Sequence, residues 1–372
     1  MWSRDPGIVN ARDALVRGPA PTGAPVRIGV VGAGRIGRRH VELVRRSLAC
    51  ELVGVVDPDP RAGRLTSVGD APWYRTLDEM LETGSVDGVI VATPNTLHLT
   101  HALPCIAAGI AVLVEKPIAT TVADGVRMAD MSEQHGAPLL VGHHRRHSPL
   151  LVAARAILAE RRLGDVVAAT AATMFAKPDD YFEAAAWRRE AGGGPILINL
   201  IHDVDALRML LGDVVSVQAV AANTVRGFPV EETVAVTMRF SSGALGSLLL
   251  SDTAAAPVSW ELTAGEDPAF PRHGDRDCYV IAGTRGTLGI PTMRLLTSDG
   301  APSWHRPLLP SVSHVMPADP LSRQLEHFCG VIRRNEQPLV SGRDAVETLR
   351  VTLAIAEAAR TGRAVACAPV EP

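Results

Sequence analysis

The sequence predicts an α/β chain of two domains: a doubly wound parallel sheet first, then an α+β domain with an open, largely antiparallel sheet. Three observations support this prediction. The chain has 372 residues, which is long for a single hydrophobic core. Over the first 147 residues, short apolar runs alternate with helix-length stretches, as in βαβ units. Beyond Pro149, several apolar runs follow one another at short spacing, which favours an antiparallel sheet.

The first domain is predicted over residues 25–147. Its strands are rich in valine and isoleucine, as expected for a buried parallel sheet, and span residues 26–31, 51–56, 87–92, 111–114 and 138–141. Helices are predicted over residues 35–47, 97–108 and 122–135. Residues 1–24 mix charges with many Pro, Gly and Ala residues and are predicted to be a flexible tail. Asp5 and Asp13 argue against the alternative, a transit peptide.

The second domain is predicted over residues 148–372. Helices are expected over residues 150–161, 203–211, 322–334 and 344–360. Strand-like segments are expected over residues 166–174, 214–225, 233–240, 244–251 and 258–264. The connection Ser241-Ser242-Gly243 is short enough to join antiparallel neighbours.

Composition excludes several classes of function. The net charge is -3 with no long basic run, which argues against a nucleic-acid partner. The longest apolar stretches, such as residues 244–250, are far shorter than the roughly 20 residues of a membrane helix, so no membrane association is expected. The five cysteines form no Cys-x-x-Cys pair, which indicates reduced thiols and a cytoplasmic protein. No metal site is predicted, since His143 and His147 would flank a strand end without an adjacent carboxylate.

The segment Gly32-Ala33-Gly34-Arg35-Ile36-Gly37 directly follows the first predicted strand and opens the first predicted helix. A G-x-G-x-x-G pattern in this context predicts a dinucleotide-binding turn and a Rossmann domain. Gly32 would permit the tight turn, Gly34 the approach of the pyrophosphate, and Gly37 the packing of helix on strand. The free amides at the helix start would stabilise the phosphate charge.

The cofactor predicted from the next strand is NAD. Asp57 stands at its end, 20 residues after Gly37, where a carboxylate accepts hydrogen bonds from the adenosine ribose hydroxyls. The same carboxylate would repel the 2′-phosphate of NADP. Arg61 and Arg64 follow closely and would weaken that preference.

Three further segments complete a family pattern. Thr93-Pro94-Asn95 with His98 follows the third strand, Glu115-Lys116-Pro117 follows the fourth, and Gly192-Gly193-Gly194 precedes His202 and Asp205. With the glycine turn, these segments resemble the glucose–fructose oxidoreductase / inositol dehydrogenase (Gfo/Idh/MocA) family, from Val26 to Val365. The resemblance implies a Rossmann domain followed by an open sheet that often forms the subunit interface. A homodimer or homotetramer is therefore expected.

The resemblance also implies the catalytic residues. Lys116 would hydrogen-bond the reacting hydroxyl, where an ammonium stabilises the charge that develops on oxygen. His202 would take the hydroxyl proton as general base, the alternative being a core histidine. The chain departs from the family four residues before His202, where many members carry an aspartate and this chain has Ile198. Asn199 follows it and can hydrogen-bond substrate, but it cannot act as a base.

Other residues are expected around the cofactor and the substrate. Cofactor contacts are predicted for Gly32, Ala33, Gly34, Arg35, Ile36, Asp57, Thr93, Pro94, Asn95, His98, Glu115 and Lys116. Substrate contacts are predicted for His144, Arg146, Trp187, Asn199 and His202. Trp260 and Glu261, placed on a strand, are further possible contacts, with core packing equally expected for the tryptophan. Asp205 is expected to orient neighbours or cap its helix rather than to catalyse.

These residues predict hydride transfer between NAD and a secondary alcohol of a sugar, cyclitol or related ring. The basic run of residues 142–147 leaves open a substrate that carries a carboxylate. Two alternatives also remain: a glycosidase that uses transient oxidation by NAD, and a non-catalytic regulator that binds the dinucleotide. Lys116 and His202 argue against the regulator, whereas Ile198 argues for it.

Overall fold

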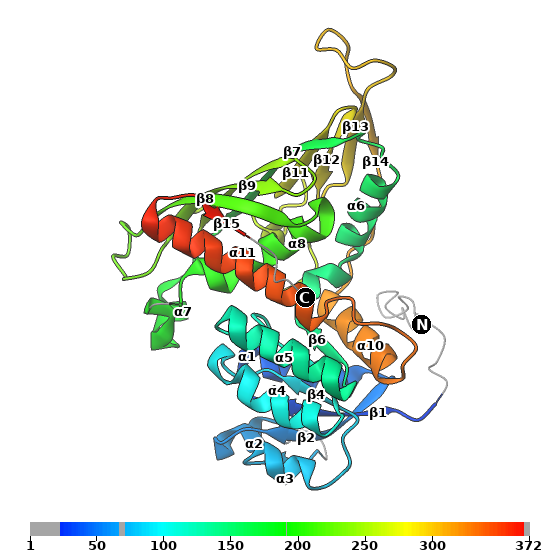
Figure 1. Ribbon diagram of the computed structural model, residues 1–372, viewed down its shortest axis with the longest axis vertical. Coiled ribbons are helices and arrows are strands. Elements are labelled where there is room, and N and C mark those ends of the chain that lie inside the picture. Colours follow the sequence, from blue (N-terminus) through cyan, green and yellow to red (C-terminus); the bar gives the residue numbers. More distant parts are fainter. Residues whose placement is uncertain (1–22, 67–70, 191, 368–372) are drawn as a thin grey trace, which may run out of the picture.

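A computed structural model describes residues 23–66, 71–190 and 192–367 (Figure 1). The expected tail therefore lies almost wholly outside the described residues. Within them the chain forms two sheets, one near each end of the long axis in Figure 1, with helices packed between and beside them. No helix of the described residues combines the length and the apolar character that a membrane span requires.

The N-terminal sheet has six parallel strands in the order β3-β2-β1-β4-β5-β6. They are β1 (Val26–Val31), β2 (Cys50–Val56), β3 (Trp73–Tyr74), β4 (Gly88–Val91), β5 (Ala111–Val114) and β6 (Leu139–Val141). The helices of this region are α1 (Arg35–Arg46), α2 (Pro60–Thr66), α3 (Leu77–Leu81), α4 (His98–Ala107) and α5 (Val122–His135). The strand order reverses at β1, between β2 and β4, and ligands bind at the carboxyl ends of strands beside such a reversal.

The C-terminal sheet has nine strands in the order β14-β13-β12-β11-β7-β10-β9-β8-β15. Its members are β7 (Val166–Met174), β8 (Val214–Ala222), β9 (Thr233–Phe240), β10 (Leu245–Ser251), β11 (Tyr279–Gly283), β12 (Gly286–Ile290), β13 (Arg294–Thr297), β14 (Leu309–Val312) and β15 (Val365–Ala366). Only β7 and β10 pair in parallel, so the sheet is mixed but largely antiparallel, as predicted.

One face of this sheet is covered and the other is open. Buried and exposed residues alternate along β9 and β10, and the buried set joins a core with α6 (Pro149–Ala159), α8 (Ile201–Leu211) and α11 (Gly342–Thr361). Figure 1 shows these three helices on the side of the sheet that faces the Rossmann domain. The remaining helices are α7 (Asp179–Glu183), α9 (Trp260–Thr263) and α10 (Pro320–Ile332).

The chain returns to the Rossmann domain near its C-terminal end. Leu325 and Phe328 of α10 belong to the hydrophobic core around β1, and Val346 and Leu349 of α11 belong to the core around β5. Two parts of the molecule that are distant in sequence therefore share cores. This packing adds C-terminal helices to the first domain's core, whereas the boundary at residues 147 and 148 remains a prediction.

Most predicted elements are confirmed within a few residues, but one is wrong. Residues 258–264 were expected to form a strand, and they contain the short helix α9 instead. The side chain of Ser259 accepts a hydrogen bond from the amide of Leu262, which caps this helix at its N-terminus. The predicted strand over residues 214–225 ends at Ala222, and the helix expected from Asp203 begins at Ile201.

Candidate active site

The glycine turn has the shape that a dinucleotide requires. Gly32 has φ +96°, and a Cβ on it would lie 2.7 Å from the carbonyl oxygen of Ala92. A Cβ on Gly37 would lie 1.9 Å from the carbonyl oxygen of Gly32, so helix α1 packs directly on the turn. A Cβ on Gly34, by contrast, would meet no described atom within 4 Å. The space beside Gly34 and the uncapped amides that open α1 fit a pyrophosphate.

Asp57 lies beside this turn at the end of β2. Its Oδ2 accepts a hydrogen bond from the amide of Ala33 at 2.8 Å, and its Oδ1 accepts one from the amide of Asp59 at 2.9 Å. The carboxylate is half-buried and adjoins the turn, which fits ribose hydroxyls better than a 2′-phosphate. The exposed Arg61 is paired with Asp59 at 2.9 Å.

Two residues that were predicted to contact the cofactor, His98 and Glu115, are buried and hold loops of the site in place. His98 is buried, with Nδ1 2.8 Å from the carbonyl oxygen of Pro117 and Nε2 3.0 Å from that of Thr93. It therefore braces the loops after β4 and β5, and the prediction that it contacts the cofactor is corrected. Thr93 and Asn95 are half-buried and Pro94 is exposed, so these three remain candidate contacts.

Glu115 was also predicted to contact the cofactor, and this prediction is corrected too. Its Oε1 lies 2.7 Å from Nε2 of His40 on α1, and both side chains are buried. Burial alone would raise the pKa of Glu115, but the hydrogen bond and charge of His40 outweigh it and hold the pKa at about 2. Glu115 is thus an ionised anchor for the loop after β5 rather than a cofactor ligand.

Lys116 reaches from the carboxyl end of β5 into the second domain. Its Nζ donates a hydrogen bond of 2.8 Å to the carbonyl oxygen of Ile198, and the Lys116–Pro117 peptide bond is cis. Burial lowers the pKa of Lys116 to about 8, although the neighbouring charge of Glu115 opposes the shift. The pKa of Lys116 therefore lies near neutral pH, as is needed for a group that takes part in proton transfer.

His202 faces Lys116 from the first turn of α8, which a π-helical segment (Ile196–Leu200) precedes. Such π-turns occur mostly where a function requires them. Burial and the charge of Lys116 lower the pKa of His202 well below 6.5, so the imidazole is neutral. Its Nδ1 and the Oδ1 of Asn199 are buried, and neither has a hydrogen-bond partner among the described residues. The ring of His144 lies 5.0 Å from that of His202, between their centroids.

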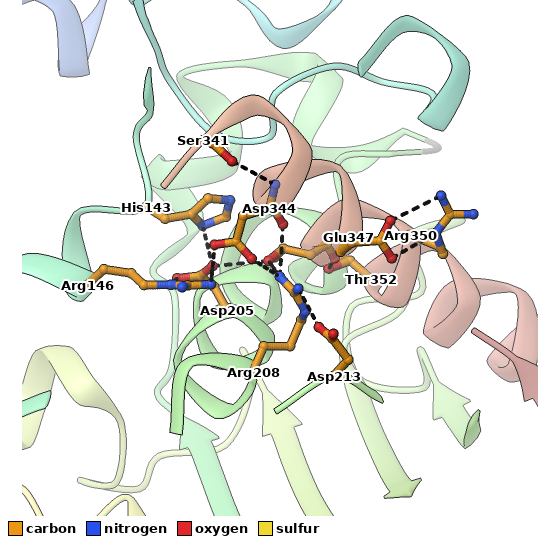
Figure 2. A network of polar contacts seen from close by, with 11 residues as sticks. His143, Arg146, Asp205, Arg208, Asp213, Ser341, Asp344, Glu347, Arg350 and Thr352 are labelled. Atoms are coloured by element: carbon orange, nitrogen blue, oxygen red, sulfur yellow. Dashed lines mark hydrogen bonds and ion pairs between the residues drawn. The ribbon is translucent and has the colours of Figure 1, made fainter. Parts of the chain in front are cut away.

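The arginines of the basic run are structural. Arg145 is buried between Asp203, at 2.8 Å, and Glu261, at 2.6 Å. Arg146 pairs with Asp205 at 2.7 Å and with Asp344 at 2.9 Å (Figure 2). The prediction that Arg146 binds substrate is therefore corrected, because its guanidinium is fully committed to two carboxylates.

The tryptophans differ in position. Trp260 is buried in the core, stacks on Tyr279 with centroids 5.7 Å apart and donates a hydrogen bond to Glu266. Trp187 is 51% exposed, on the 3-10 turn Ala186–Arg189, and lies beside Arg188. Trp187 thus remains a candidate substrate contact, whereas Trp260 is not one.

One signal in the sequence identifies Lys116 without any motif. The chain contains 37 Lys and Arg residues, and only Lys116 and Lys177 are lysines. Where charge alone is needed, this chain uses arginine, whose guanidinium does not release its proton in proteins. A lysine in this chain is therefore a candidate for chemistry that arginine cannot perform, and Lys116 is one of two such candidates.

Comparison with known proteins identifies the family. A family model described as "Oxidoreductase family, NAD-binding Rossmann fold" matches residues 26–143, and the "GFO/IDH/MocA C-terminal domain" matches residues 151–289. The 1,5-anhydro-D-fructose reductase of Ensifer adhaerens is 30% identical over 343 residues, which cover 91% of this chain and 97% of the relative. The inositol 2-dehydrogenase of Rhizobium meliloti (strain 1021) is 29% identical over 342 residues, or 90% of this chain and 96% of the relative.

Solved structures show the same architecture. The WlbA dehydrogenase from Bordetella pertussis, in complex with NADH and UDP-GlcNAcA, superposes with a TM-score of 0.74 at 26% identity. The match covers 94% of this chain and 100% of that chain. Together with the glycine turn, Asp57 and Lys116, these matches show that the chain is an NAD-binding oxidoreductase that belongs to the Gfo/Idh/MocA family.

Proposed function

We propose that this protein oxidises, reversibly, a secondary hydroxyl of a sugar, cyclitol or related ring, with Lys116 and His202 as its catalytic residues. The observation that carries the proposal is the position of the Lys116 ammonium. It lies partly buried at the carboxyl end of β5, 2.8 Å from the carbonyl oxygen of Ile198 and near a neutral His202.

The proposed reaction removes two hydrogens from the CH–OH group, a hydride from carbon and a proton from oxygen, and delivers them to two acceptors. The nicotinamide ring of bound NAD supplies the acceptor for the hydride that leaves carbon. The neutral imidazole of His202 takes the hydroxyl proton, and the Lys116 ammonium donates a hydrogen bond to the oxygen as it gains negative charge. Because the substrate oxygen would replace the Ile198 carbonyl as partner of Lys116, no new charge has to be buried.

An uncharged, hydroxyl-rich ring fits the polar atoms of the site. The Oδ1 of Asn199 and the Nδ1 of His202 are buried without partners among the described residues, and hydroxyl groups would supply both. The main argument for a substrate that carries a carboxylate no longer holds, because Arg145 and Arg146 are already paired with carboxylates of the protein. The names of the relatives, an anhydrofructose reductase and an inositol 2-dehydrogenase, point to the same class.

The test is a panel of sugars, inositols and hydroxy acids with NAD, in which NADH formation is followed by absorbance. We expect turnover with at least one polyol, and a loss of roughly 100-fold to 10,000-fold in kcat/KM for Lys116→Met. Binding of NAD to the variant, measured by calorimetry, separates a loss of chemistry from a loss of cofactor.

Other outcomes would identify another function. Release of free sugar from a glycoside without net NADH would indicate the glycosidase. Tight NAD binding with no turnover of any polyol would contradict the proposal and favour a regulator.

We also propose that the protein is a cytoplasmic homodimer or homotetramer joined through the open face of the nine-stranded sheet. This face carries exposed apolar side chains, among them Leu249 and Val280, which are 40% and 39% exposed. A groove of about 500 Å³ crosses it between β7, β8, β9 and β10. Burial against a second copy would cover this apolar surface. The cytoplasmic location is supported by the five cysteines, which are all unpaired and buried.

A further inference from the structure

Glu261, on the short helix α9, has one carboxylate oxygen that nothing in the described part of the chain satisfies. Its Oε1 accepts a hydrogen bond of 2.6 Å from Nη2 of Arg145. Its Oε2 is buried and has no hydrogen-bond partner among the described residues, although the side chain as a whole is 24% exposed. Leaving a buried carboxylate oxygen unpaired is costly, so such an atom calls for a ligand or a water.

Arg145 determines where this oxygen lies. Its guanidinium holds Glu261 on one nitrogen and Asp203, the neighbour of His202 in sequence, on the other. Asp203 is closed to ligands, because Tyr279 and Arg145 occupy its Oδ1 and Thr173 its Oδ2. Of the two carboxylates on Arg145, only Glu261 keeps an open oxygen.

Glu261 is tied to the catalytic pair through Arg145, which also holds Asp203, the sequence neighbour of His202. Its charge also acts on Lys116 and His144, and it raises the pKa of both against the lowering effect of burial. The ring of His144 in turn lies 5.0 Å from that of His202. Ile198, at the position where the family resemblance implies an aspartate, offers Lys116 only its backbone carbonyl.

We propose that Glu261 binds the substrate: its Oε2 accepts a hydrogen bond from a second hydroxyl of the polyol that Lys116 and His202 oxidise. This inference rests on the proposed function and makes Glu261 a determinant of specificity. Burial would raise the pKa of Glu261, but the charge of Arg145 outweighs it and keeps the pKa below its usual range. The carboxylate therefore remains ionised, selects hydroxyl donors and repels a substrate carboxylate at this position.

The test compares Glu261→Gln and Glu261→Ala with wild type on the best polyol and on its deoxy analogues. The matched control is Glu266→Gln, which changes another buried glutamate five positions along, bound to Ser148 and Trp260. We expect KM for the polyol to rise roughly tenfold to a hundredfold in the Glu261 variants, as for loss of a hydrogen bond to a charged group. NAD affinity should not change, and the control should keep the wild-type KM.

The deoxy analogues separate recognition from a structural effect. For one deoxy analogue, wild type should show the same fold-loss in kcat/KM that Glu261→Ala causes with the full polyol. Glu261→Ala should react with that analogue no worse than wild type does. An equal loss across all analogues, or an unchanged KM in both Glu261 variants, would overturn the inference and leave the proposed function intact. If wild type oxidises no polyol, the proposed function fails, and the role of Glu261 fails with it.

Discussion

At the scale of single residues, burial lowers the pKa of both catalytic candidates, and the two shifts prepare them for opposite tasks. Lys116, with a pKa of about 8, is still mostly protonated at neutral pH and can donate a hydrogen bond. His202, with a pKa well below 6.5, is neutral there and can accept a proton. Each group is thus in the protonation state that oxidation of an alcohol requires.

A pH profile follows from these two shifts. Raising the pH through about 8 removes the Lys116 proton, so kcat/KM for alcohol oxidation should fall on the alkaline side. Burial and the charge of Lys116 hold the pKa of His202 well below 6.5, so the acid limb should lie well below pH 6.5. Lys116→Arg should move the alkaline limb upward, because arginine keeps its proton. An alkaline limb that stays near 8 in this variant would assign it to another group.

The sequence identified the residues whose roles depend on motifs, but not their partners. Lys116 and His202 could be predicted as catalytic residues because each follows a recognisable segment. The ion pairs of Arg146 with Asp205 and Asp344 could not, since their members lie 59 and 198 positions away and meet only after folding. For the same reason, no sequence pattern could distinguish the open oxygen of Glu261 from the closed ones of Asp203.

At the scale of elements, the glycine turn allows two similar substitutions to be compared. Gly37→Ala would place a methyl group 1.9 Å from a backbone oxygen, and neither helix α1 nor strand β1 can move aside cheaply. Gly34→Ala would meet no described atom, and Gly34 has φ -66°, which alanine adopts without strain. We therefore expect Gly37→Ala to lower the melting temperature, and Gly34→Ala to leave it unchanged.

Cofactor binding should separate these variants further. The Gly34 methyl group would fill space needed by the pyrophosphate, so the Kd for NAD should rise at least about tenfold in a fully folded protein. Calorimetric titration with NAD and a thermal melt of each variant provide the two measurements. An unchanged Kd in Gly34→Ala would show that the pyrophosphate lies elsewhere.

The helices and strands were predicted correctly where one spacing of apolar residues dominated the sequence. The valine-rich strands β1, β4 and β5 are buried on both faces and read clearly as parallel strands. The strand predicted over residues 258–264 was wrong because the Ser259 cap, a local hydrogen bond, outweighed its apolar pattern. Strands β11 to β14 were missed, since each has only four or five residues and all but β11 have few apolar positions in a row.

At the scale of the whole molecule, the open sheet face governs the expected assembly. Leu249→Arg would place a charge at the centre of this face, beside Ala172 and Ala235 on the neighbouring strands. We expect it to shift the protein from dimer or tetramer toward monomer in size-exclusion chromatography with light scattering. Leu48→Arg is the matched control, because Leu48 is 68% exposed and follows α1 on the Rossmann domain. A wild-type monomer at micromolar concentration would contradict the proposed assembly.

The scarcity of lysine gives this protein a built-in spectroscopic probe. Reductive methylation with isotopically labelled formaldehyde modifies amines, and Lys116 and Lys177 are the only side chains that carry one. The NMR spectrum of the product would contain two lysine signals and one from the chain terminus. The chain-terminal amine also titrates near pH 8 and burial lowers the pKa of Lys177 as well, so Lys177→Arg is needed to assign the Lys116 signal. The protonation of the proposed catalytic amine can thus be followed directly, before any substrate is known.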